Sequence, residues 1–505
     1  MNPKRSKMTK SGLAICVLSL LGALEARSLR AEETISAAPP SPYSVVRVNV
    51  TNQGWDFFRP WGKRAPFSRR AVGAVLPGNR VLVTGDFVAN ANYVELETPD
   101  SGEKTPARIE AVDYEANLAV LAIDDEKFLK PFTPLDLSIA RVGDLLSVLQ
   151  LETNGALLVT HGTMTNAEVS RYPVEESSLL VYHLATPLQF RESAATLPVV
   201  KDNKLVGLIM RYDAQSTNAD IIPAPVIEHF LRDAAHPPYK GFPHGGVGFD
   251  TTRDPQLRRY LGLNGQTPGG VYITELQGGS PASKAGLEVG DVLLRIDDQA
   301  VDQDGNYADP VYGKIALSHL LSTKRYVGDE VKFTVFRKGE TKDFNLRLAH
   351  RAVEDYTIEP YVIDRAPKFY ILGGMVMEEL SRQYLKEWGQ DWVKKAPEDL
   401  VYLDRNQSEF FPDGKGKVVF LSRVLPSDAT VGYEELHHLV VTKINGVEIH
   451  KLEDIPGALT KAAKGLHKIE FSDEPAVIYL DSQQVEQAGE ILTKSYQLPE
   501  LQRLN

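Results

Sequence analysis

Histidine is the side chain that most often acts as a general base at neutral pH, and the first half of this sequence offers few candidates. Residues 43–235 contain His161, His183 and His229. His183 lies in an apolar run typical of a strand, which favours a packed core or edge residue. His229 lies in a helical pattern, where it packs or faces solvent. Both are therefore interpreted as structural residues.

Metal and thiol chemistry find equally little support. His437 and His438 are adjacent in sequence, and adjacent residues of a helix face different directions, so we predict no metal site there. The only cysteine, Cys16, lies in an N-terminal apolar segment. If that segment is removed, the remaining chain forms no disulfide and has no reactive thiol. We expect neither a metal nor a cofactor.

The elements that would position any site are mostly short strands. Val46, Val48 and Val50 alternate with polar residues, as in a half-buried strand. Further short apolar runs follow at 80–83, 117–123, 145–149, 179–184 and 205–210, separated by Gly, Asn and Asp turns. This pattern favours a β-barrel or sandwich over a parallel α/β sheet. One helix is predicted at 225–233, with a proline in its first turn.

Length and charge set the domain count and exclude one class of partner. The chain has 505 residues, which suits about three domains at a prior of ~150 residues each. Its net charge of -11, without a long basic run, argues against nucleic-acid binding. The Pro- and Gly-containing segment 234–243 is typical of a linker. We divide the chain into a first module (43–235), a second (244–350), a third (355–480) and a helical tail (481–505).

Residues 1–31 have the features of a signal peptide. A positive segment is followed by the short apolar run 12–24, and then by small residues at which cleavage could occur, near Ala26 or Ala31. The apolar run is too short for a comfortable membrane span, although an uncleaved anchor is the alternative. We expect an exported protein of the periplasm or another extracytoplasmic space, with the signal peptide removed.

The first module resembles the protease domain of the HtrA/Deg serine proteases. The similar segments are "RVLVTGDFV" (80–88), "VDYEANLAVLAI" (112–123), "LPVVKDNKLVGLIM" (197–210) and "IIPAPVIEHFL" (221–231), in the family's order and spacing. The chain looks most similar to the plant-type Deg proteins with two PDZ domains, from Tyr43 nearly to the C-terminus. The resemblance implies a mainly β fold: a trypsin-like double β-barrel followed by two PDZ-like α+β domains.

The three catalytic positions of that family are all changed in this sequence. Trypsin-like catalysis needs a Ser nucleophile, a His base and an Asp that orients the base. By the resemblance, the His falls on Phe87 (or on Asp86 with a shift of one residue), the Asp on Asn117 and the Ser on Ala195. Phenylalanine is no base, alanine is no nucleophile, and an amide does not stabilise an imidazolium. The resemblance thus implies a pseudoprotease with no catalytic residue at these positions.

The loop around the nucleophile position is changed as well. Ser193, Thr196 and Leu197 stand where the family has glycines, which disfavours the tight turn of an oxyanion hole. Ser193 is two positions from the nucleophile site and would be displaced from it. The alternative is an active serine endopeptidase of protein quality control that uses a non-standard site.

Residues 246–249 resemble the carboxylate-binding loop of PDZ domains. The loop consists of Gly246, Val247, Gly248 and Phe249. Its glycines let successive backbone N–H groups point at a terminal carboxylate, and the following strand can accept a peptide by β-augmentation. The segment 278–301 carries further features of the same domain, and we expect a helix at 313–324 to line the groove. The alternative is a strand start that merely tolerates glycine.

The third module is more diverged. "GGMVM" (373–377) is a candidate second carboxylate loop, and Asn445-Gly446 predicts a hairpin turn. An insertion at 381–417 departs from an ordinary PDZ domain. By the resemblance, we expect this module to serve assembly rather than peptide capture.

An aromatic cluster near the start of the first module is a candidate oligomer interface. It consists of Trp55, Phe57, Phe58 and Trp61. Clustered Trp and Phe are typical interface anchors, and the resemblance implies packing of protease domains into trimers. The alternative is a loop whose aromatic side chains pack onto their own barrel.

These observations predict a non-catalytic exported scaffold, chaperone or regulatory subunit. Its expected partners are polypeptide substrates or protein C-termini, copies of itself in a trimer-based oligomer, and an active homologous protease.

Overall fold

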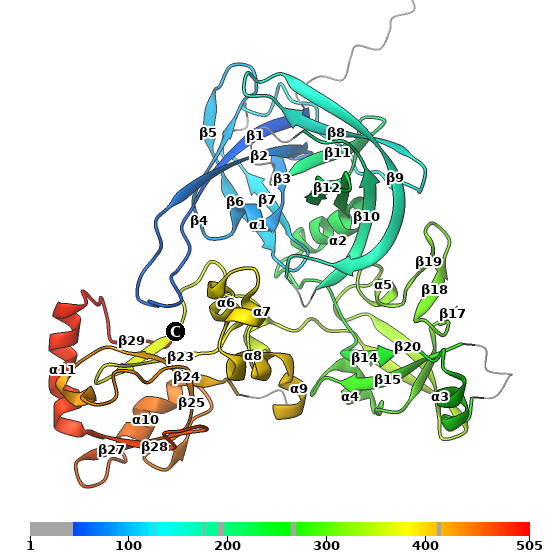
Figure 1. Cartoon of the computed structure of the whole chain (residues 1–505). Helices are drawn as coiled ribbons and strands as arrows, with labels where there is room; N and C mark the ends of the chain where they lie inside the picture. Colours follow the sequence, from blue (N-terminus) through cyan, green and yellow to red (C-terminus); the bar gives the residue numbers. More distant parts are fainter. Residues whose placement is uncertain (1–43, 126, 175–176, 190–195, 264–268, 412–415) are drawn as a thin grey trace, which may run out of the picture. The chain divides into compact units, whose positions relative to one another are not determined.

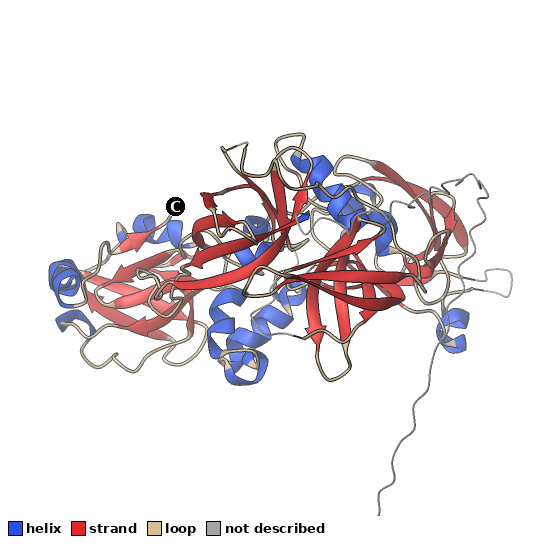
Figure 2. Cartoon of the chain, turned by 90° about the horizontal axis from the view of Figure 1, so that it is seen from above, coloured by secondary structure: helices blue, strands red, loops and turns tan. Residues whose placement is uncertain are grey.

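The computed structural model describes residues 44–505, except 126, 175–176, 190–195, 264–268 and 412–415 (Figure 1). Strands hold 40% of the residues and helices 18%, which confirms the predicted mainly β class (Figure 2). No helix in the described part of the chain has the length and apolar character needed to cross a bilayer.

The first half of the first module is a seven-stranded antiparallel sheet in the order β5-β4-β1-β2-β3-β7-β6. Val46, Val48 and Val50 are at most 1% exposed, as their alternation predicted. The short helix α1 (Gly85–Val88) follows β3. The strands are β1 (Val45–Asn52), β2 (Phe67–Leu76), β3 (Arg80–Val83), β4 (Ala91–Glu97), β5 (Lys104–Pro106), β6 (Arg108–Asp113) and β7 (Leu118–Ala122).

The second half of the first module is a closed barrel, β10-β13-β12-β11-β8-β9. Helix α2 (Ala224–Ala234) follows it, close to the predicted 225–233. A double barrel was predicted, and the structure closes the second sheet, whereas the end strands β5 and β6 of the first sheet each have one strand neighbour. The strands are β8 (Leu145–Leu151), β9 (Leu157–Arg171), β10 (Ser178–Ala185), β11 (Leu197–Lys201), β12 (Lys204–Asp213) and β13 (Asn218–Pro223).

The second module is an antiparallel sheet, β14-β15-β16-β20-β21, with β17 paired to β16 and a separate hairpin of β18 and β19. Its helices are α3 (Pro255–Tyr260), α4 (Pro281–Ala285) and α5 (Ser318–Leu321). The strands are β14 (Val247–Asp250), β15 (Val271–Leu276), β16 (Val292–Ile296), β17 (Gln299–Ala300), β18 (Asn306–Asp309), β19 (Gly313–Ala316), β20 (Glu330–Arg337) and β21 (Glu340–Arg347).

The third module has a sheet in the order β28-β27-β25-β24-β23-β22-β29, with β26 paired to β25. Its strands are β22 (Phe369–Leu372), β23 (Met375–Glu379), β24 (Val419–Val424), β25 (Leu439–Ile444), β26 (Val447–Glu448), β27 (Leu466–Phe471), β28 (Val477–Asp481) and β29 (Gln502–Arg503). Its helices are α6 (Arg382–Leu385), α7 (Trp392–Lys395), α8 (Glu398–Arg405), α9 (Gln407–Phe410), α10 (Ile455–Leu459) and α11 (Ser482–Ser495). Helices α6–α9 form the insertion noted in the sequence.

Two boundaries differ from the sequence analysis. The predicted helix at 313–324 is wrong in its first half, which forms β19, and only Ser318–Leu321 is helical. The segment 481–505, separated above as a tail, begins with the predicted helix α11, and its strand β29 then pairs with β22. This segment therefore contributes to the sheet of the third module.

Candidate functional site

The position of the family's catalytic histidine is a core position in this structure. Phe87 lies in α1 and is fully buried among the valines and leucines of the first sheet. The guanidinium of Arg69 lies 5.4 Å from the centre of its ring. Asp86, the alternative position, is exposed. The local geometry therefore gives Phe87 a packing role.

Asn117 supports the backbone of the same turn. It has a left-handed φ of 53°, which asparagine tolerates better than most residues. Its Oδ1 accepts a hydrogen bond of 2.8 Å from the backbone N–H of Asp86. Its Nδ2 is buried and has no hydrogen-bond partner. The amide thus holds α1 in place.

The nucleophile position, Ala195, lies outside the described residues, as does Ser193. Its neighbour Thr196 is fully buried, and its hydroxyl lies 2.7 Å from that of Thr84. Thr84 also donates its backbone N–H to Thr196 Oγ1 over 3.1 Å. Thr84 is three residues before Phe87, so these hydrogen bonds bring Thr196 close to α1.

Within the described residues, the three histidines of the first module form no complete catalytic set. His183 has carboxylates at both ring nitrogens, Asp220 at 2.9 Å and Glu168 at 3.0 Å, and neither nitrogen hydrogen-bonds a serine or threonine hydroxyl. His229 is stacked between Phe242 and Tyr326, and its Nε2 lies 2.8 Å from the carbonyl of Arg325.

His161 comes nearest to a catalytic pair, because its Nδ1 lies 3.0 Å from Ser147 Oγ. Within the described residues, no carboxylate hydrogen-bonds its other ring nitrogen, so the orienting member of a triad is missing. The same residues contain no cluster of three or more His, Cys, Asp or Glu side chains that could hold a metal ion.

The second module contains an open groove beside the predicted carboxylate loop. Strand β14 is at the edge of its sheet and, among the described strands, pairs only with β15. A cavity of about 250 Å³ is lined by Val247 and Phe249 of β14 and by Leu317 and Leu321. Phe333 lines the same cavity and is fully buried. An edge strand facing an apolar cavity is the arrangement that β-augmentation requires.

The loop before β14 needs its glycine. Gly246 has a φ of +71°, and a Cβ at this position would lie 2.2 Å from the Cβ of Ser280. The hydroxyl of Ser280 donates to the carbonyl of Gly246 over 3.4 Å. Glycine tolerates both this left-handed conformation and the close contact with Ser280 at the start of α4, so the backbone can turn toward the groove. The structure therefore brings Gly246, Val247 and Phe249 to one cavity, with Gly248 between them.

In the third module, the strand that contains the candidate carboxylate loop has strand neighbours on both sides. The two glycines of the "GGMVM" segment form the turn between β22 and β23, its last three residues begin β23, and β23 pairs with β22 on one side and β24 on the other. Strand β22 in turn pairs with β29. Among the described residues, β23 therefore has a strand neighbour on both sides, and the expectation that this module serves assembly rather than peptide capture stays a prediction. The predicted hairpin at Asn445-Gly446 joins β25 and β26.

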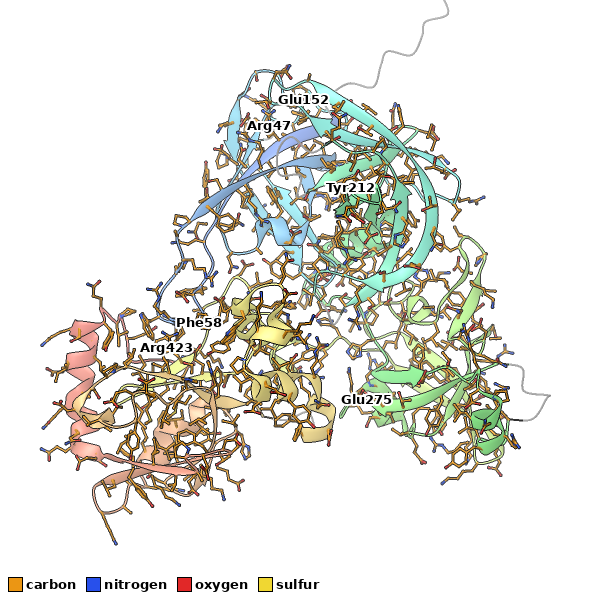
Figure 3. All side chains as sticks on the ribbon, in the orientation of Figure 1. Arg47, Phe58, Glu152, Tyr212, Glu275 and Arg423 are labelled. Atoms are coloured by element: carbon orange, nitrogen blue, oxygen red, sulfur yellow. The ribbon has the colours of Figure 1, made fainter. Side chains whose placement is uncertain are left out.

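The aromatic cluster of the first module packs against the third. Phe57 is 5% exposed and belongs to one hydrophobic cluster with Tyr384, Trp392 and Phe420. Phe58 makes an edge-on contact with Trp388 at 4.8 Å between ring centres, and Arg423 lies 5.8 Å from its ring (Figure 3).

Trp55 and Trp61 also contact residues of the strands of the third module. Arg503 lies 4.8 Å from the Trp55 ring, and the Trp61 ring lies 6.1 Å from that of Phe369. All four aromatic side chains therefore have partners in the third module of the same chain. The oligomer interface stays a prediction.

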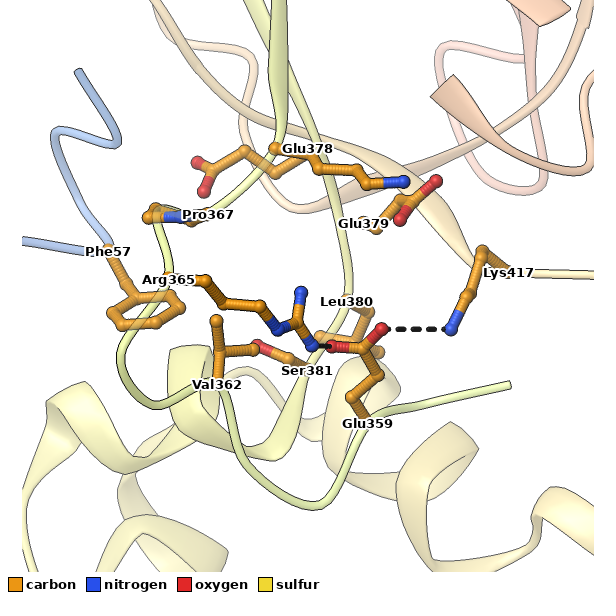
Figure 4. A pocket seen from close by; sticks show the side chains of 11 residues that line it. Phe57, Glu359, Val362, Arg365, Pro367, Glu378, Glu379, Leu380, Ser381 and Lys417 are labelled. Carbon is orange, nitrogen blue, oxygen red and sulfur yellow. Dashed lines mark hydrogen bonds and ion pairs between the residues drawn. The ribbon is translucent and has the colours of Figure 1, made fainter. Parts of the chain in front are cut away.

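Buried carboxylates lie beneath this contact. Glu378 is 2% exposed, and its Oε1 has no hydrogen-bond partner. Burial raises its pKa to about 8, and Asp56 and Glu387 add to the shift while Ser422 and Arg423 oppose it. Glu378 lines a small cavity that also contains Phe57, and in the same cavity Glu359 lies between Arg365 and Lys417 (Figure 4). Burial also raises the pKa of Glu387, to about 6.

The sequence analysis missed two polar residues of the open groove, His244 and Gln277. Both line the cavity with an atom that is buried and lacks a hydrogen-bond partner, His244 Nε2 and Gln277 Oε1. His244 lies two residues before the glycine loop, and this position in the sequence could have indicated that it lines the groove. Nothing in the sequence indicates the position of Gln277.

Comparisons with known proteins cover nearly the whole chain. Residues 246–348 and 358–502 each match the PDZ domain family. Protease Do-like 4, mitochondrial, of Arabidopsis thaliana is 24% identical over 464 residues, which are 90% of this chain and 84% of that protein. Protease Do-like 2, chloroplastic, of the same plant is 26% identical, over 90% of this chain and 74% of that protein.

Among solved structures, the HtrA-type protease AlgW with decapeptide aligns with a TM-score of 0.46 at 17% identity, covering 62% of this chain and 96% of that chain. Two matched PDZ domains and Do-like relatives that align along 90% of the sequence show that this chain belongs to the HtrA/Deg (Do-like) family and carries two PDZ domains.

Proposed function

We propose that this chain is a catalytically inactive HtrA/Deg-family protein that binds polypeptide termini or partner proteins through its first PDZ domain. It acts as an exported scaffold, chaperone or regulatory subunit. The observation that carries the proposal is the open edge of β14 beside an apolar cavity, at the end of a glycine-containing loop. Such a groove supplies backbone partners for a peptide strand and an apolar surface for alternate side chains.

The residues at the three positions that the resemblance marks as catalytic support the proposal that the chain is catalytically inactive. Phe87 has no titrating group and packs in the core. Asn117 already uses its oxygen to hold α1. The sequence places Ala195 at the nucleophile position. A base, an orienting carboxylate and a nucleophile would all have to come from elsewhere, and the first-module histidines supply no such set.

Export and assembly complete the proposal. The signal-like residues 1–31 support a periplasmic or other extracytoplasmic location. Family membership supports a trimer-based oligomer, and it makes an active homologous protease a suitable partner. The inactive chain would then contribute peptide-binding grooves to a mixed assembly.

The proposed peptide binding is tested with a pool of fluorescein-labelled decapeptides that have apolar residues at their last three positions. We expect saturable binding to the mature chain by fluorescence anisotropy. Ser318 lines the groove at the start of α5, so Ser318→Trp fills the groove and weakens binding at least tenfold. Ser283→Trp, on the exposed face of α4 in the same domain, is the matched control and leaves binding unchanged. Absence of binding to the wild-type chain, or equal loss in both variants, would refute the proposed function.

A further inference from the structure

The third module contains a hollow that is separate from the β14 groove and that we call the α11 hollow. It has a volume of about 690 Å³ and is lined by residues of strands β22 and β29 and of helices α10 and α11. Ile371, Leu372 and Leu492 line it and are each at most 5% exposed. Half-buried apolar side chains complete this surface: Leu459, Val485 and Leu501. A concave, mostly apolar surface of this size is typical of a small-molecule site.

Two polar side chains, His467 and Ser482, line the α11 hollow among these apolar ones. In the pairing of β27 with β28, His467 lies opposite Leu480. The backbone N–H of Ser482 donates to the carbonyl of Gly465 over 2.9 Å, which continues this ladder into the first residue of α11. Because side chains of a strand alternate between its faces, Ser482 lies on the same face as Leu480 and His467. The hairpin therefore presents both polar side chains to the hollow.

The hydroxyl of Ser482 lacks a partner. Its Oγ is buried and has no hydrogen bond among the described residues. Nearly all buried polar groups in folded proteins are hydrogen-bonded, because an unpaired one costs free energy. The partner of this hydroxyl must therefore come from the contents of the hollow.

The hydrogen bonds of Asn445 determine which nitrogen of His467 carries the proton. Asn445 Oδ1 accepts from the backbone N–H of Lys468 over 2.8 Å, and its Nδ2 donates to the carbonyl of Ala458 over 3.1 Å. The same Nδ2 lies 3.2 Å from His467 Nδ1. An amide nitrogen only donates, so Nδ1 accepts. Burial lowers the pKa of His467, so the ring is neutral at pH 7 and has its single N–H at Nε2.

The charges of the lining restrict the head group of a ligand. Among the described residues that line the hollow, the one carboxylate is that of Glu486, and none is a lysine or arginine. A carboxylate head would be repelled by Glu486. An ammonium head has no lone pair with which to accept the N–H of His467. An uncharged carbonyl oxygen has two lone pairs and can accept from both His467 and Ser482.

We propose that the α11 hollow binds an uncharged acyl compound, which consists of an apolar chain and an ester or amide carbonyl. The carbonyl oxygen accepts from His467 Nε2–H and from the hydroxyl of Ser482. The apolar chain lies against the side chains of Leu459, Val485 and Leu492. This site is separate from the β14 groove, and the inference does not depend on the proposed function.

The experiment is isothermal titration calorimetry of the mature chain with monodecanoylglycerol, below the concentration at which this lipid forms micelles. We expect saturable binding of one molecule per chain. Decanoate has a similar apolar chain but a charged head at pH 7, and it should bind at least about tenfold more weakly because of Glu486.

A variant of α11 tests whether the ligand occupies the hollow. Gly489 lines it, and a Cβ at this position would lie 3.0 Å from Leu501 Cδ1. Gly489→Leu therefore fills the hollow, and the helix tolerates it because leucine has a higher helix propensity than glycine. We expect binding of monodecanoylglycerol to weaken at least about tenfold. Gln487→Leu, at an exposed position of the same helix, is the matched control and should leave binding unchanged.

Two further variants test the head-group contacts. His467→Phe keeps a flat ring without a donor, and Ser482→Ala removes the hydroxyl. Each should weaken binding about threefold to tenfold, as expected for the loss of one hydrogen bond to an uncharged group. Should His467→Phe fail to fold, Ser482→Ala alone decides.

Four results would overturn the inference. These are no binding of monodecanoylglycerol, tighter binding of decanoate, full binding by Gly489→Leu, and full binding by Ser482→Ala. Displacement of monodecanoylglycerol by the decapeptide pool would also overturn it, because the occupant of the hollow would then be a polypeptide.

Discussion

Phe87 and Asn117, onto which the resemblance places two catalytic residues of a protease family, both make contacts that hold the fold together. The phenylalanine fills the core of the first sheet, and the asparagine accepts a backbone hydrogen bond from the turn that carries it. The sequence predicts a loss of catalytic chemistry from the residue types at these positions, and this stays a prediction. It did not predict the packing role of Phe87, which depends on strands far away along the chain.

We predict that Phe87→His destabilises the protein by about 2–4 kcal/mol, because it removes a packed ring and buries a polar imidazole without a partner. Urea unfolding of the mature chain provides the measurement. Phe87→Leu, which keeps an apolar side chain, is the control and should cost less than about 1.5 kcal/mol. An equally stable Phe87→His variant would mean that the ring turns out of the core.

We also predict that the wild-type chain neither cleaves unfolded casein nor reacts with a fluorophosphonate probe. The triple revertant Ala195→Ser, Asn117→Asp, Phe87→His tests whether the scaffold still supports catalysis. Its comparison with wild type must be made at a temperature where urea unfolding shows it to be folded. Casein cleavage by the wild-type chain would show that a displaced site exists and would remove the case for a pseudoprotease.

At the scale of elements, local patterns predicted most strands, and long-range packing decided the exceptions. The spacing of Ile315, Leu317, Leu320 and Leu321 suits a helix. However, residues 313–316 pair with 306–309, and Ile315 joins the core cluster of the closed barrel. The partner of the aromatic segment was missed for the same reason. The rings of residues 57 and 58 meet side chains more than three hundred positions away, and no local periodicity encodes such a contact.

We predict that Phe57→Ala costs about 3–5 kcal/mol of stability, because it opens a cavity in the cluster that joins the aromatic segment to the third module. Thermal unfolding and limited proteolysis of the third module would detect the change. Phe67→Ala is the matched control, since Phe67 is 54% exposed and its truncation should cost little. If Phe57→Ala lowered the oligomer mass in light scattering without changing the unfolding midpoint, the predicted interchain interface would replace the intrachain role.

The stability of the whole molecule should depend on pH through Glu378 and Glu387, the buried carboxylates near the contact between the aromatic segment and the third module. The pKa of Glu378 is raised by burial to about 8 and that of Glu387 to about 6, against an ordinary value of 4.5. The folded state therefore holds protons that the unfolded state releases. Their stabilising contribution is full below pH 4.5 and is lost as the pH rises through 6 and then 8.

We predict that the free energy of unfolding falls between about pH 4.5 and pH 8, with a slope of up to about 1.4 kcal/mol per pH unit from Glu378. Glu378→Gln keeps a neutral side chain of the same shape and should flatten this part of the curve. Glu490→Gln, at an exposed position on α11, should leave it as in wild type. A wild-type curve that is flat over this range would contradict the protonated state of Glu378.

Strand β22 has a consequence for valency. Because it covers the edge of β23, the proposed function assigns peptide binding to the β14 groove, and we expect that groove to saturate at one peptide per chain. The proposal further expects this groove to hold a polypeptide end reversibly. Avidity can then arise only when several chains are joined. The number of subunits in an assembly therefore determines how firmly a client protein with several chain ends is retained, and the number of PDZ domains in a chain does not.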